Sequence, residues 1–290
     1  MHFIYSLVGK YTYIMRIALC GALGKMGREV YEYCQNLNDI EVVSLVDKRF
    51  DGADLYKGTP QNQRLSDAEN YVDSQYENAD FNCQQKDIET VCDIENAQSD
   101  FDAIIDFSSH DATISILKAA IVRRCAVVLA TTGHTEEEKK YIEYASRFIP
   151  LFYSNNMSLG IAVLAKCVKE TLTLFKKADV EIVETHHVEK LDVPSGTALM
   201  LAGVVKDAIG GQIVVGRHKN GKKQDGDIGV HSLRMGSVFG QHEVRINTGE
   251  EAMVFTHEAL SRKVYAKGAI EAVRYLKNQT AGLYETEDLL

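Results

Sequence analysis

The chain has 290 residues, of which 45% are hydrophobic and 25% are charged, and its formal net charge is -9. This length suits two ordinary domains, and the balance of residue types excludes a disordered or fibrous protein. The negative charge argues against general nucleic-acid binding, because such proteins concentrate Lys and Arg against the phosphate backbone. Any anionic ligand must therefore meet a local positive pocket.

The first 14 residues contain a short apolar run but neither a basic start nor a small-residue cleavage site. They fit a secretory signal poorly, and we predict that residues 1–14 are an N-terminal extension. No other segment is long and apolar enough to span a bilayer, so no membrane contact is expected. The six cysteines form no C-x-x-C pair and show no zinc-ligand spacing, which favours a reduced, cytoplasmic chain without a metal site.

The first half of the chain alternates buried strands with helices. Continuous apolar runs are typical of parallel strands that are covered on both faces. Strands are predicted at 16–20, 41–46, 101–107 and 126–130, and helices at 25–36 and 113–123. A long acidic and polar stretch between residues 47 and 102 predicts loops with one short strand.

The second half has a different pattern. Helices are predicted at 161–175, 197–209 and 264–277, and a strand at 180–184. Three further segments, 228–234, 238–247 and 253–258, alternate apolar and polar residues, which is typical of half-buried antiparallel strands. We therefore expect a second sheet with one solvated face.

Three glycines lie between the first strand and the first helix. Gly21, Gly24 and Gly27 would let backbone N–H groups approach a pyrophosphate, where side chains would block the way. Their G-x-x-G-x-x-G spacing is weak evidence alone, because a plain strand-to-helix turn has the same composition. Asp47 ends the next strand, where a carboxylate can accept hydrogen bonds from ribose hydroxyls, and the pair of features predicts dinucleotide binding.

Residues beside Asp47 bear on the choice of coenzyme. The Asp47 carboxylate would repel a 2′-phosphate, whereas Lys48 and Arg49 could pair with one. Our hypothesis is that NADH is preferred and that NADPH is accepted.

The densest group of polar residues follows the strand at 180–184. His186, His187 and Lys190 would form a positive pocket whose members can act as general acids. The two alternatives are a polar histidine pair at a strand end and a metal pair. Adjacent histidines on a strand point to opposite faces, and no further metal ligands are evident, so a catalytic anion pocket is favoured.

The next helix begins within the same segment. Ser195, Gly196 and Thr197 would lie at its N-terminus, where the helix dipole favours a carboxylate. The alternative is that Asp192 or Ser195 only caps the helix, and capping is compatible with ligand binding.

These residues resemble the signature of the 4-hydroxy-tetrahydrodipicolinate reductases, formerly called dihydrodipicolinate reductases. The pattern E-x-H-H-x-x-K-x-D-x-P-S-G-T-A is met from Glu184 to Ala198. Other matching features follow in order along the chain: GxxGxMG at 21–27, the acid at Asp47, DFS at 106–108, TTG at 131–133, Asn156 with Ser158, and Ser261 with Arg262. Three departures are Ala130 in place of a glycine, Met157 in place of an aromatic residue, and Ser109 and His110 where a charged residue is expected.

The resemblance implies an α/β protein with two domains and an N-terminal extension. A Rossmann-type parallel sheet would span residues 15–157 with 263–290. An inserted α+β domain of mixed sheet, residues 158–262, would bind a small dicarboxylate substrate and build a homotetramer. The implied reaction is the NAD(P)H-dependent reduction of 4-hydroxy-tetrahydrodipicolinate to tetrahydrodipicolinate in lysine and diaminopimelate biosynthesis.

The resemblance also implies roles for single residues. His186 would donate or accept a proton, Lys190 would donate one, and the substrate carboxylates would meet His187, Ser195, Gly196 and Thr197, with Arg262 a further contact. The coenzyme would be bound by Gly21, Ala22, Leu23, Gly24, Lys25, Met26, Asp47, Lys48, Ala130, Thr131, Thr132, Ser154, Asn155, Asn156 and Met157. Two other functions remain possible from sequence: a related amine or imine dehydrogenase, and a non-catalytic dinucleotide sensor, although a sensor should have lost Lys190 or the histidines.

Overall fold

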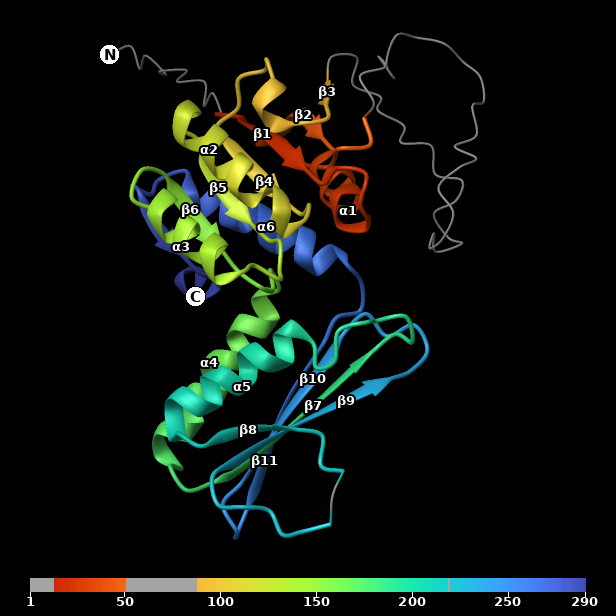
Figure 1. Ribbon diagram of the computed structural model, residues 1–290, viewed down its shortest axis with the longest axis vertical. Helices are drawn as coiled ribbons and strands as arrows, with labels where there is room; N and C mark the ends of the chain where they lie inside the picture. The colour runs from red at the N-terminus through yellow and green to blue at the C-terminus, as the bar shows by residue number, and fades with distance from the viewer. Residues whose placement is uncertain (1–12, 51–87, 219) are drawn as a thin grey trace, which may run out of the picture.

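The computed structural model describes residues 13–50, 88–218 and 220–290. Figure 1 shows these residues as two parts, each built around its own sheet, with α4 leading from one part to the other. Most of the predicted N-terminal extension and most of the acidic stretch lie outside the described residues.

The first sheet has seven strands, all of them parallel, in the order β12-β6-β5-β4-β1-β2-β3. Its strands are β1 (Met15–Cys20), β2 (Ile40–Val46), β3 (Glu89–Val91), β4 (Ala103–Asp106), β5 (Ala126–Leu129), β6 (Pro150–Tyr153) and β12 (Gly282–Tyr284). The four apolar runs of the first half form β1, β2, β4 and β5, which confirms the predicted parallel sheet. The short strand expected in the acidic stretch is β3.

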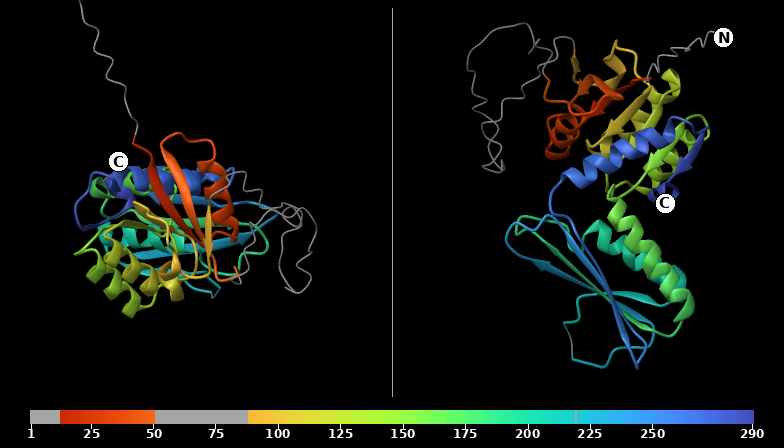
Figure 2. Two further views of the ribbon diagram at one scale, coloured as in Figure 1. Left: turned by 90° about the horizontal axis from the view of Figure 1, so that it is seen from above. Right: turned by 180° about the vertical axis from the view of Figure 1, so that it is seen from behind.

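Helices cover both faces of this sheet. The helices α1 (Lys25–Cys34) and α6 (Lys263–Leu276) share one hydrophobic core with the strands, and α2 (Thr113–Arg123) and α3 (Glu136–Ala145) share the core on the other face. Figure 2 shows α6 and α2 on opposite sides of the strands. Burial on both faces explains why the strands read as continuous apolar runs.

The C-terminal segment belongs spatially with the N-terminal part. After α6 the chain adds β12 beside β6, in register from Gly282 with Pro150 to Tyr284 with Phe152. The two ends of the described chain are therefore built into one sheet domain, although the domain boundaries given above stay a proposal.

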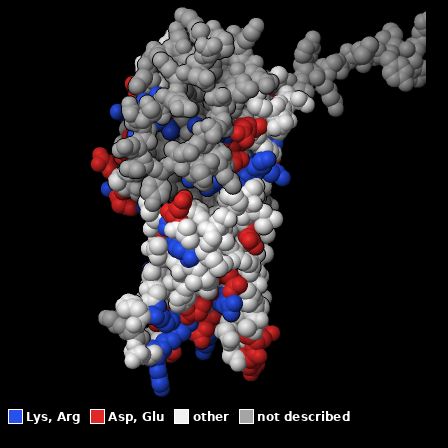
Figure 3. Space-filling model, turned by 90° about the vertical axis from the view of Figure 1, so that its right-hand side faces the viewer, with Lys and Arg blue, Asp and Glu red and all other residues white. Residues whose placement is uncertain are grey.

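The second sheet has five strands in the order β11-β10-β7-β9-β8. They are β7 (Asp179–His186), β8 (Gln212–Val215), β9 (Asp227–Arg234), β10 (Gln241–Asn247) and β11 (Ala252–Glu258). The helices α4 (Leu159–Leu174) and α5 (Gly196–Ile209) pack on one face and form the third hydrophobic core with it. No described helix covers the other face, where basic and acidic side chains are intermixed on the part of the molecule seen at the lower end of Figure 3.

One strand direction differs from the prediction. The segment 228–234 was predicted as antiparallel, but β9 runs parallel to both β7 and β8, and only β10 pairs antiparallel, with β7 and β11. The prediction was wrong because alternation reports a half-buried face and not a direction. Here α5 carries the chain back across the sheet to β8, and the connection between β8 and β9 carries it back again, so both strands run in the direction of β7.

The sequence prediction also missed four elements. Strands β6, β8 and β12 have only three or four residues and carry little pattern. Helix α3 is rich in charge, but Thr135 and Glu138 form a capping box at its start, with the Glu138 N–H donating to Thr135 Oγ1 and the Thr135 N–H donating to Glu138 Oε2. This T-x-x-E pattern was available in the sequence.

Candidate active site

The glycine turn after β1 is too tight for side chains at two positions. Gly21 has φ +76°, and a Cβ there would lie 2.5 Å from the Phe107 carbonyl oxygen. A Cβ at Gly27 would lie 2.2 Å from the Gly21 carbonyl oxygen. Gly24 caps α1 with no side-chain hydrogen bond. The turn therefore leaves bare backbone at a helix N-terminus, which is the arrangement that receives a pyrophosphate.

Asp47 follows β2 beside this turn. Its Oδ2 accepts from the Leu23 N–H at 3.0 Å, and the Arg49 guanidinium donates to both carboxylate oxygens at 2.7 Å. Burial raises the pKa of Asp47, but the hydrogen bonds from Arg49 and Leu23 outweigh this and hold the pKa below its usual value. Asp47 is thus an anion that a neighbouring cation already covers. Lys48 is exposed at the same edge.

The next predicted coenzyme residues follow β5 and β6. Thr131 is buried and donates from Oγ1 to Asp106 Oδ2 at 2.9 Å, while the Ser108 N–H donates to Asp106 Oδ1 at 2.8 Å. Burial raises the pKa of Asp106, although both of these neighbours oppose it. Asp106 therefore ties the end of β4 to the loop after β5, where Ala130 and Thr132 also lie.

The loop after β6 is held from several sides. Ser154 Oγ donates to the Asn156 carbonyl oxygen at 2.8 Å, and Thr286 near the C-terminus donates to Ser154 Oγ at 2.6 Å. Asn155 is exposed, whereas the Met157 side chain is only 3% exposed and belongs to the core beside α6. Any contact of Met157 with a coenzyme in this conformation would therefore use its backbone.

The coenzyme residues predicted from sequence thus follow β1, β2, β5 and β6. The carboxyl ends of parallel strands meet at one edge of the sheet, and the strand order reverses between β1 and β4. Ligands of open parallel sheets bind at such a position.

His186 ends β7 and lies against a fully buried carboxylate. Its Nδ1 is 2.5 Å from Glu184 Oε2, and the Glu184 side chain has 0% exposure. Arg234 at the end of β9 donates from Nη1 to both Glu184 oxygens at 3.0 Å. Burial raises the pKa of Glu184, but the hydrogen bonds from His186 and Arg234 bring it down to about 2.

The start of α5 meets the same group. Ser195 is the N-cap of α5 and accepts from the Ala198 N–H at 3.2 Å, while the Ser195 N–H donates to Glu184 Oε1 at 3.2 Å. His242 on β10 contacts Ser195 Oγ through Nε2 at 3.1 Å, and its ring lies 5.2 Å from the His186 ring. The capping role predicted for Ser195 is therefore present. Gly196 is exposed and Thr197 is buried in the first turn.

One hydrogen bond joins the two groups of predicted site residues. Asn156 Nδ2 donates to Thr197 Oγ1 at 2.8 Å, which links the loop after β6 to the first turn of α5. Nearby, Ser158 Oγ, at the N-cap of α4, lies 3.2 Å from His257 Nε2. The N-terminal ends of α4 and α5 therefore both face the coenzyme edge of the first sheet, as Figure 1 also shows.

The remaining predicted site residues form a cationic group. Burial, and then the charge of Arg262, lowers the pKa of His187, and Lys190 contributes in the same direction. Lys190 Nζ lies 2.7 Å from Asp192 Oδ1, with 22% of its side chain exposed. Arg262 begins α6 and lies over the Phe239 ring at 5.2 Å. The charges of Arg262 and Lys190 therefore act on His187, and the positive pocket expected in this acidic chain stays a prediction.

Comparison with known proteins places the chain in a family. The family models for the N-terminal and C-terminal parts of dihydrodipicolinate reductase match residues 15–157 and 160–290. A 4-hydroxy-tetrahydrodipicolinate reductase of Caldanaerobacter subterraneus subsp. tengcongensis is 36% identical over 280 residues, covering 96% of this chain and 98% of that protein. The chain belongs to the dihydrodipicolinate reductase family.

Other relatives agree with this membership. A 4-hydroxy-tetrahydrodipicolinate reductase of Clostridium novyi is 34% identical over 278 residues, which is 95% of this chain and 98% of that protein. The solved structure of a dipicolinate-bound dihydrodipicolinate reductase from Paenisporosarcina sp. TG-14 matches with a TM-score of 0.70 at 22% identity, covering 96% of this chain and 100% of that one. This last likeness concerns the fold, and it confirms the predicted two-part architecture.

Sequence reasoning gave no role to three residues of the reductase site. Glu184 was part of the matched motif without a function, and Arg234 and His242 come from strands read only as sheet. A buried carboxylate, arginine and histidine on neighbouring strands are visible only when β7, β9 and β10 are placed side by side. The two-residue spacing of Glu184 and His186 on one strand could have suggested a shared face.

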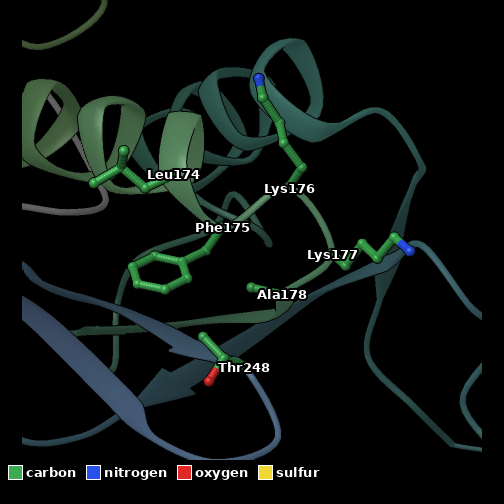
Figure 4. Close-up of a pocket in the computed structure, with 6 residues that line it drawn as sticks. All are labelled: Leu174, Phe175, Lys176, Lys177, Ala178 and Thr248. Atoms are coloured by element: carbon green, nitrogen blue, oxygen red, sulfur yellow. The ribbon is translucent and has the colours of Figure 1, made fainter.

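Two other features of the reductase do not add to the site. A pocket at the far end of α4 is lined by Leu174, Phe175, Lys176, Lys177, Ala178 and Thr248. In Figure 4 the amino groups of its two lysines point away from Thr248, and Lys176 Nζ donates to the Ala208 carbonyl oxygen at 3.1 Å. His110, Asp111 and Glu138 each offer an atom within 4.8 Å of the others, but Glu138 already pairs with His110 and caps α3. The absence of a metal requirement stays a prediction.

The pKa of His242 predicts how the stability of the reductase depends on pH. Burial, and then the neighbouring His186, lowers the pKa of His242 from 6.5 to about 3. Between these values the unfolded chain binds the proton more readily, so stability is complete above about pH 6.5 and falls on acidification. The loss at this group should reach about 2 kcal/mol at about pH 5.

Urea unfolding of the wild type and of His242→Gln at about pH 7 and pH 5 measures this contribution. The variant removes the titrating ring, so its stability should fall less over the same interval, whatever its stability at neutral pH. Equal losses in the two proteins would show that His242 is not kept neutral by the fold.

No helix of the described residues is long and apolar enough to cross a membrane. A cytoplasmic location stays a prediction.

Proposed function

We propose that this reductase uses NADH or NADPH to reduce 4-hydroxy-tetrahydrodipicolinate to tetrahydrodipicolinate, a step of lysine and diaminopimelate biosynthesis. The observation that carries the proposal is the 2.8 Å hydrogen bond from Asn156 to Thr197. It connects the loop expected to frame the nicotinamide with the helix turn expected to bind a substrate carboxylate. A hydride donor and its acceptor need such proximity to react.

The residues present fit a dinucleotide. Bare backbone at the Gly21 and Gly27 turn would receive the pyrophosphate, and the Asp47 carboxylate would accept hydrogen bonds from the adenosine ribose. When bound, the reduced nicotinamide supplies a hydride. Further coenzyme contacts are proposed for Ala22, Leu23, Gly24, Lys25, Met26, Lys48, Ala130, Thr131, Thr132, Ser154, Asn155, Asn156 and Met157.

The substrate carries two carboxylates, and the site offers two kinds of partner for them. The first turn of α5, with Ser195, Gly196 and Thr197, offers backbone N–H groups and a helix dipole. His187 and Arg262 offer cationic or donor side chains. Binding both carboxylates would fix the ring in one orientation, which is how positioning contributes to rate.

The hydroxyl group of the substrate leaves as water, and hydride addition to the resulting unsaturated ring builds negative charge that must be neutralised by a proton. Lys190 is an ammonium with three donor hydrogens, and it must exchange its contact with Asp192 for one with the substrate. His186 presents Nε2 away from Glu184, where it can donate or accept a proton. We propose Lys190 as the main proton donor and His186 as its partner.

The choice of coenzyme should follow from the Asp47 and Arg49 pair. An anionic Asp47 favours the ribose hydroxyls of NADH, whereas Arg49 can turn from Asp47 to a 2′-phosphate. We expect NADH to be preferred and NADPH to be accepted. Arg49→Gln should weaken NADPH binding by about tenfold, the loss of roughly 1.4 kcal/mol, and should leave NADH binding within about twofold.

Fluorescence titration with each coenzyme gives these dissociation constants without turnover. A coupled assay, in which the synthase of the pathway supplies the unstable substrate, gives the Michaelis constants and tests the reaction itself. Arg147→Gln is the matched control, because exposed Arg147 lies in the turn between α3 and β6, at the opposite edge of the sheet. A clear NADPH preference in the wild type would overturn the coenzyme proposal, and no turnover with either coenzyme would overturn the proposed reaction.

We also propose that the uncovered face of the second sheet assembles four copies of the chain. Half-buried strands such as β11, which alternate exposed and intermediate residues, present a surface that a second sheet can cover. Light scattering of the native protein tests the homotetramer by its mass.

A further inference from the structure

A buried carboxylate and a partly buried guanidinium lie beside the two residues that we propose to handle protons. Glu184 has 0% exposure and accepts from the Ser195 N–H, the Arg234 guanidinium and His186 Nδ1. An ionised carboxylate accepts hydrogen bonds only, so the proton between it and the imidazole belongs to Nδ1. The nitrogen that remains for chemistry is therefore Nε2.

The opposite edge of the His186 ring faces a glycine. A Cβ built at Gly240 would lie 3.1 Å from His186 Nε2 and 3.4 Å from the Tyr265 hydroxyl. A side chain at position 240 would thus cover the nitrogen that Glu184 leaves available. The contact on one side and the glycine on the other give the ring one orientation.

Arg234 connects this carboxylate to the loop that carries Lys190. Its Nη2 donates to the Asp192 carbonyl oxygen at 2.7 Å, and its Nε donates to the Lys190 carbonyl oxygen at 3.3 Å. The guanidinium therefore donates hydrogen bonds to the backbone on both sides of Leu191 while it also pairs with Glu184. Such a fork of donors cannot be reproduced by a lysine ammonium.

The loop is also tied to the end of β9 by its backbone. The Met235 N–H donates to the His186 carbonyl oxygen at 2.8 Å, and the Val188 N–H donates to the Gly236 carbonyl oxygen at 3.2 Å. These bonds hold the start of the loop, whereas Arg234 holds its middle. The position of Lys190 thus depends on the same arginine that pairs with Glu184.

We propose that Glu184 and Arg234 are positioning residues that fix, through one buried ion pair, both the His186 tautomer and the place of Lys190. In this proposal the pair acts through its contacts with His186 and with the backbone of the Lys190 loop. The inference rests on the proton-handling roles proposed for His186 and Lys190.

Glu184→Gln tests the first half of the proposal. The amide can either donate or accept, so it no longer requires the proton on Nδ1, and kcat should fall by about tenfold or more. The dissociation constant of NADH, measured by fluorescence, should stay within about twofold. Nitrogen NMR of labelled protein, with His186→Gln to assign the signal, should show one tautomer in the wild type and a mixture in the variant.

Arg234→Lys tests the second half. The ammonium cannot reach Glu184 and two carbonyl oxygens together, so the Lys190 loop should lose its position. We expect a loss of kcat of about tenfold or more and weaker binding of a pyridine dicarboxylate inhibitor, again with unchanged NADH binding. If Arg234→Lys keeps both the kcat and the inhibitor affinity of the wild type, the proposed role of the guanidinium group is wrong.

Two further variants serve as controls for a general loss of stability: one at an ion pair elsewhere in the protein, and one double variant. Asp39→Asn breaks a two-bond contact with Arg274, at 2.8 Å for each bond, in the first sheet domain, and should leave turnover unchanged. Glu184→Leu with Arg234→Met removes both charges and avoids an uncompensated buried ion, which favours a folded protein even if the single variants do not fold. It should still lose turnover.

The results distinguish a failure of the positioning role from a failure of the proposed roles of His186 and Lys190. If Glu184→Gln or the double variant is folded and turns over within twofold of the wild type, the positioning role is wrong. If Asp39→Asn loses turnover as severely, the effect is general destabilisation and the inference fails. If His186→Gln and Lys190→Met themselves keep wild-type turnover, the proposed site roles fail first.

Discussion

Replacement of Lys190 with methionine should lower turnover by about 100-fold or more, on the scale of general acid catalysis, while coenzyme binding persists. The methionine keeps the length of the side chain but has no proton to give to the reduced ring. Lys190 is 22% exposed on its side chain and pairs with an exposed aspartate, so its loss should cost little stability. His186→Gln should lose turnover on the same scale, because no titratable nitrogen remains beside Glu184.

The measurement is a coupled assay at saturating coenzyme, with fluorescence titration of NADH as the readout of binding. Lys118→Met is the matched control, since Lys118 is an exposed residue of α2 and its removal changes the net charge equally. Turnover near that of the wild type in both Lys190→Met and His186→Gln would refute their assignment as proton-handling residues.

Gly27→Ala should abolish tight coenzyme binding, because the added methyl group would lie 2.2 Å from the Gly21 carbonyl oxygen and 2.8 Å from Ala22 Cα. Both neighbours are backbone, so the turn itself must move away from the pyrophosphate. We expect NADH affinity to fall by at least about tenfold, and the variant to be destabilised by about 1–3 kcal/mol, the usual cost of overpacking.

Gly203→Ala is the matched comparison, because there is space for a side chain at this glycine. Gly203 lies in α5, and a Cβ there meets nothing within 4 Å. Alanine in a helix interior should be neutral or stabilising by about 0.5–1 kcal/mol, with NADH affinity unchanged. If Gly27→Ala binds NADH as the wild type does, the glycine turn is not the pyrophosphate site.

The sequence was sufficient for the four central strands of the coenzyme domain because their local patterns agree with their tertiary environment. Strands β1, β2, β4 and β5 are buried on both faces, so their apolar runs report the parallel sheet without ambiguity. The second sheet is covered by helices on one face, and its alternation reports that face correctly. It says nothing of strand direction, which explains the error on β9.

For the candidate site, the sequence by itself determined which residues we predict to carry the chemistry. His186, His187, Lys190 and the serine, glycine and threonine that begin α5 lie within one short segment, where their types and the helix start already predict an anion-binding pocket. Family membership added the reaction and the coenzyme.

Only the tertiary structure decided how these residues are held. Glu184, Arg234 and His242 lie on three separate strands, and the pairing of β7 with β9 and β10 brings them together. Short motifs record contacts between residues near in the chain, whereas a buried ion pair depends on which strands become neighbours. That choice is made by packing of the whole sheet against α4 and α5.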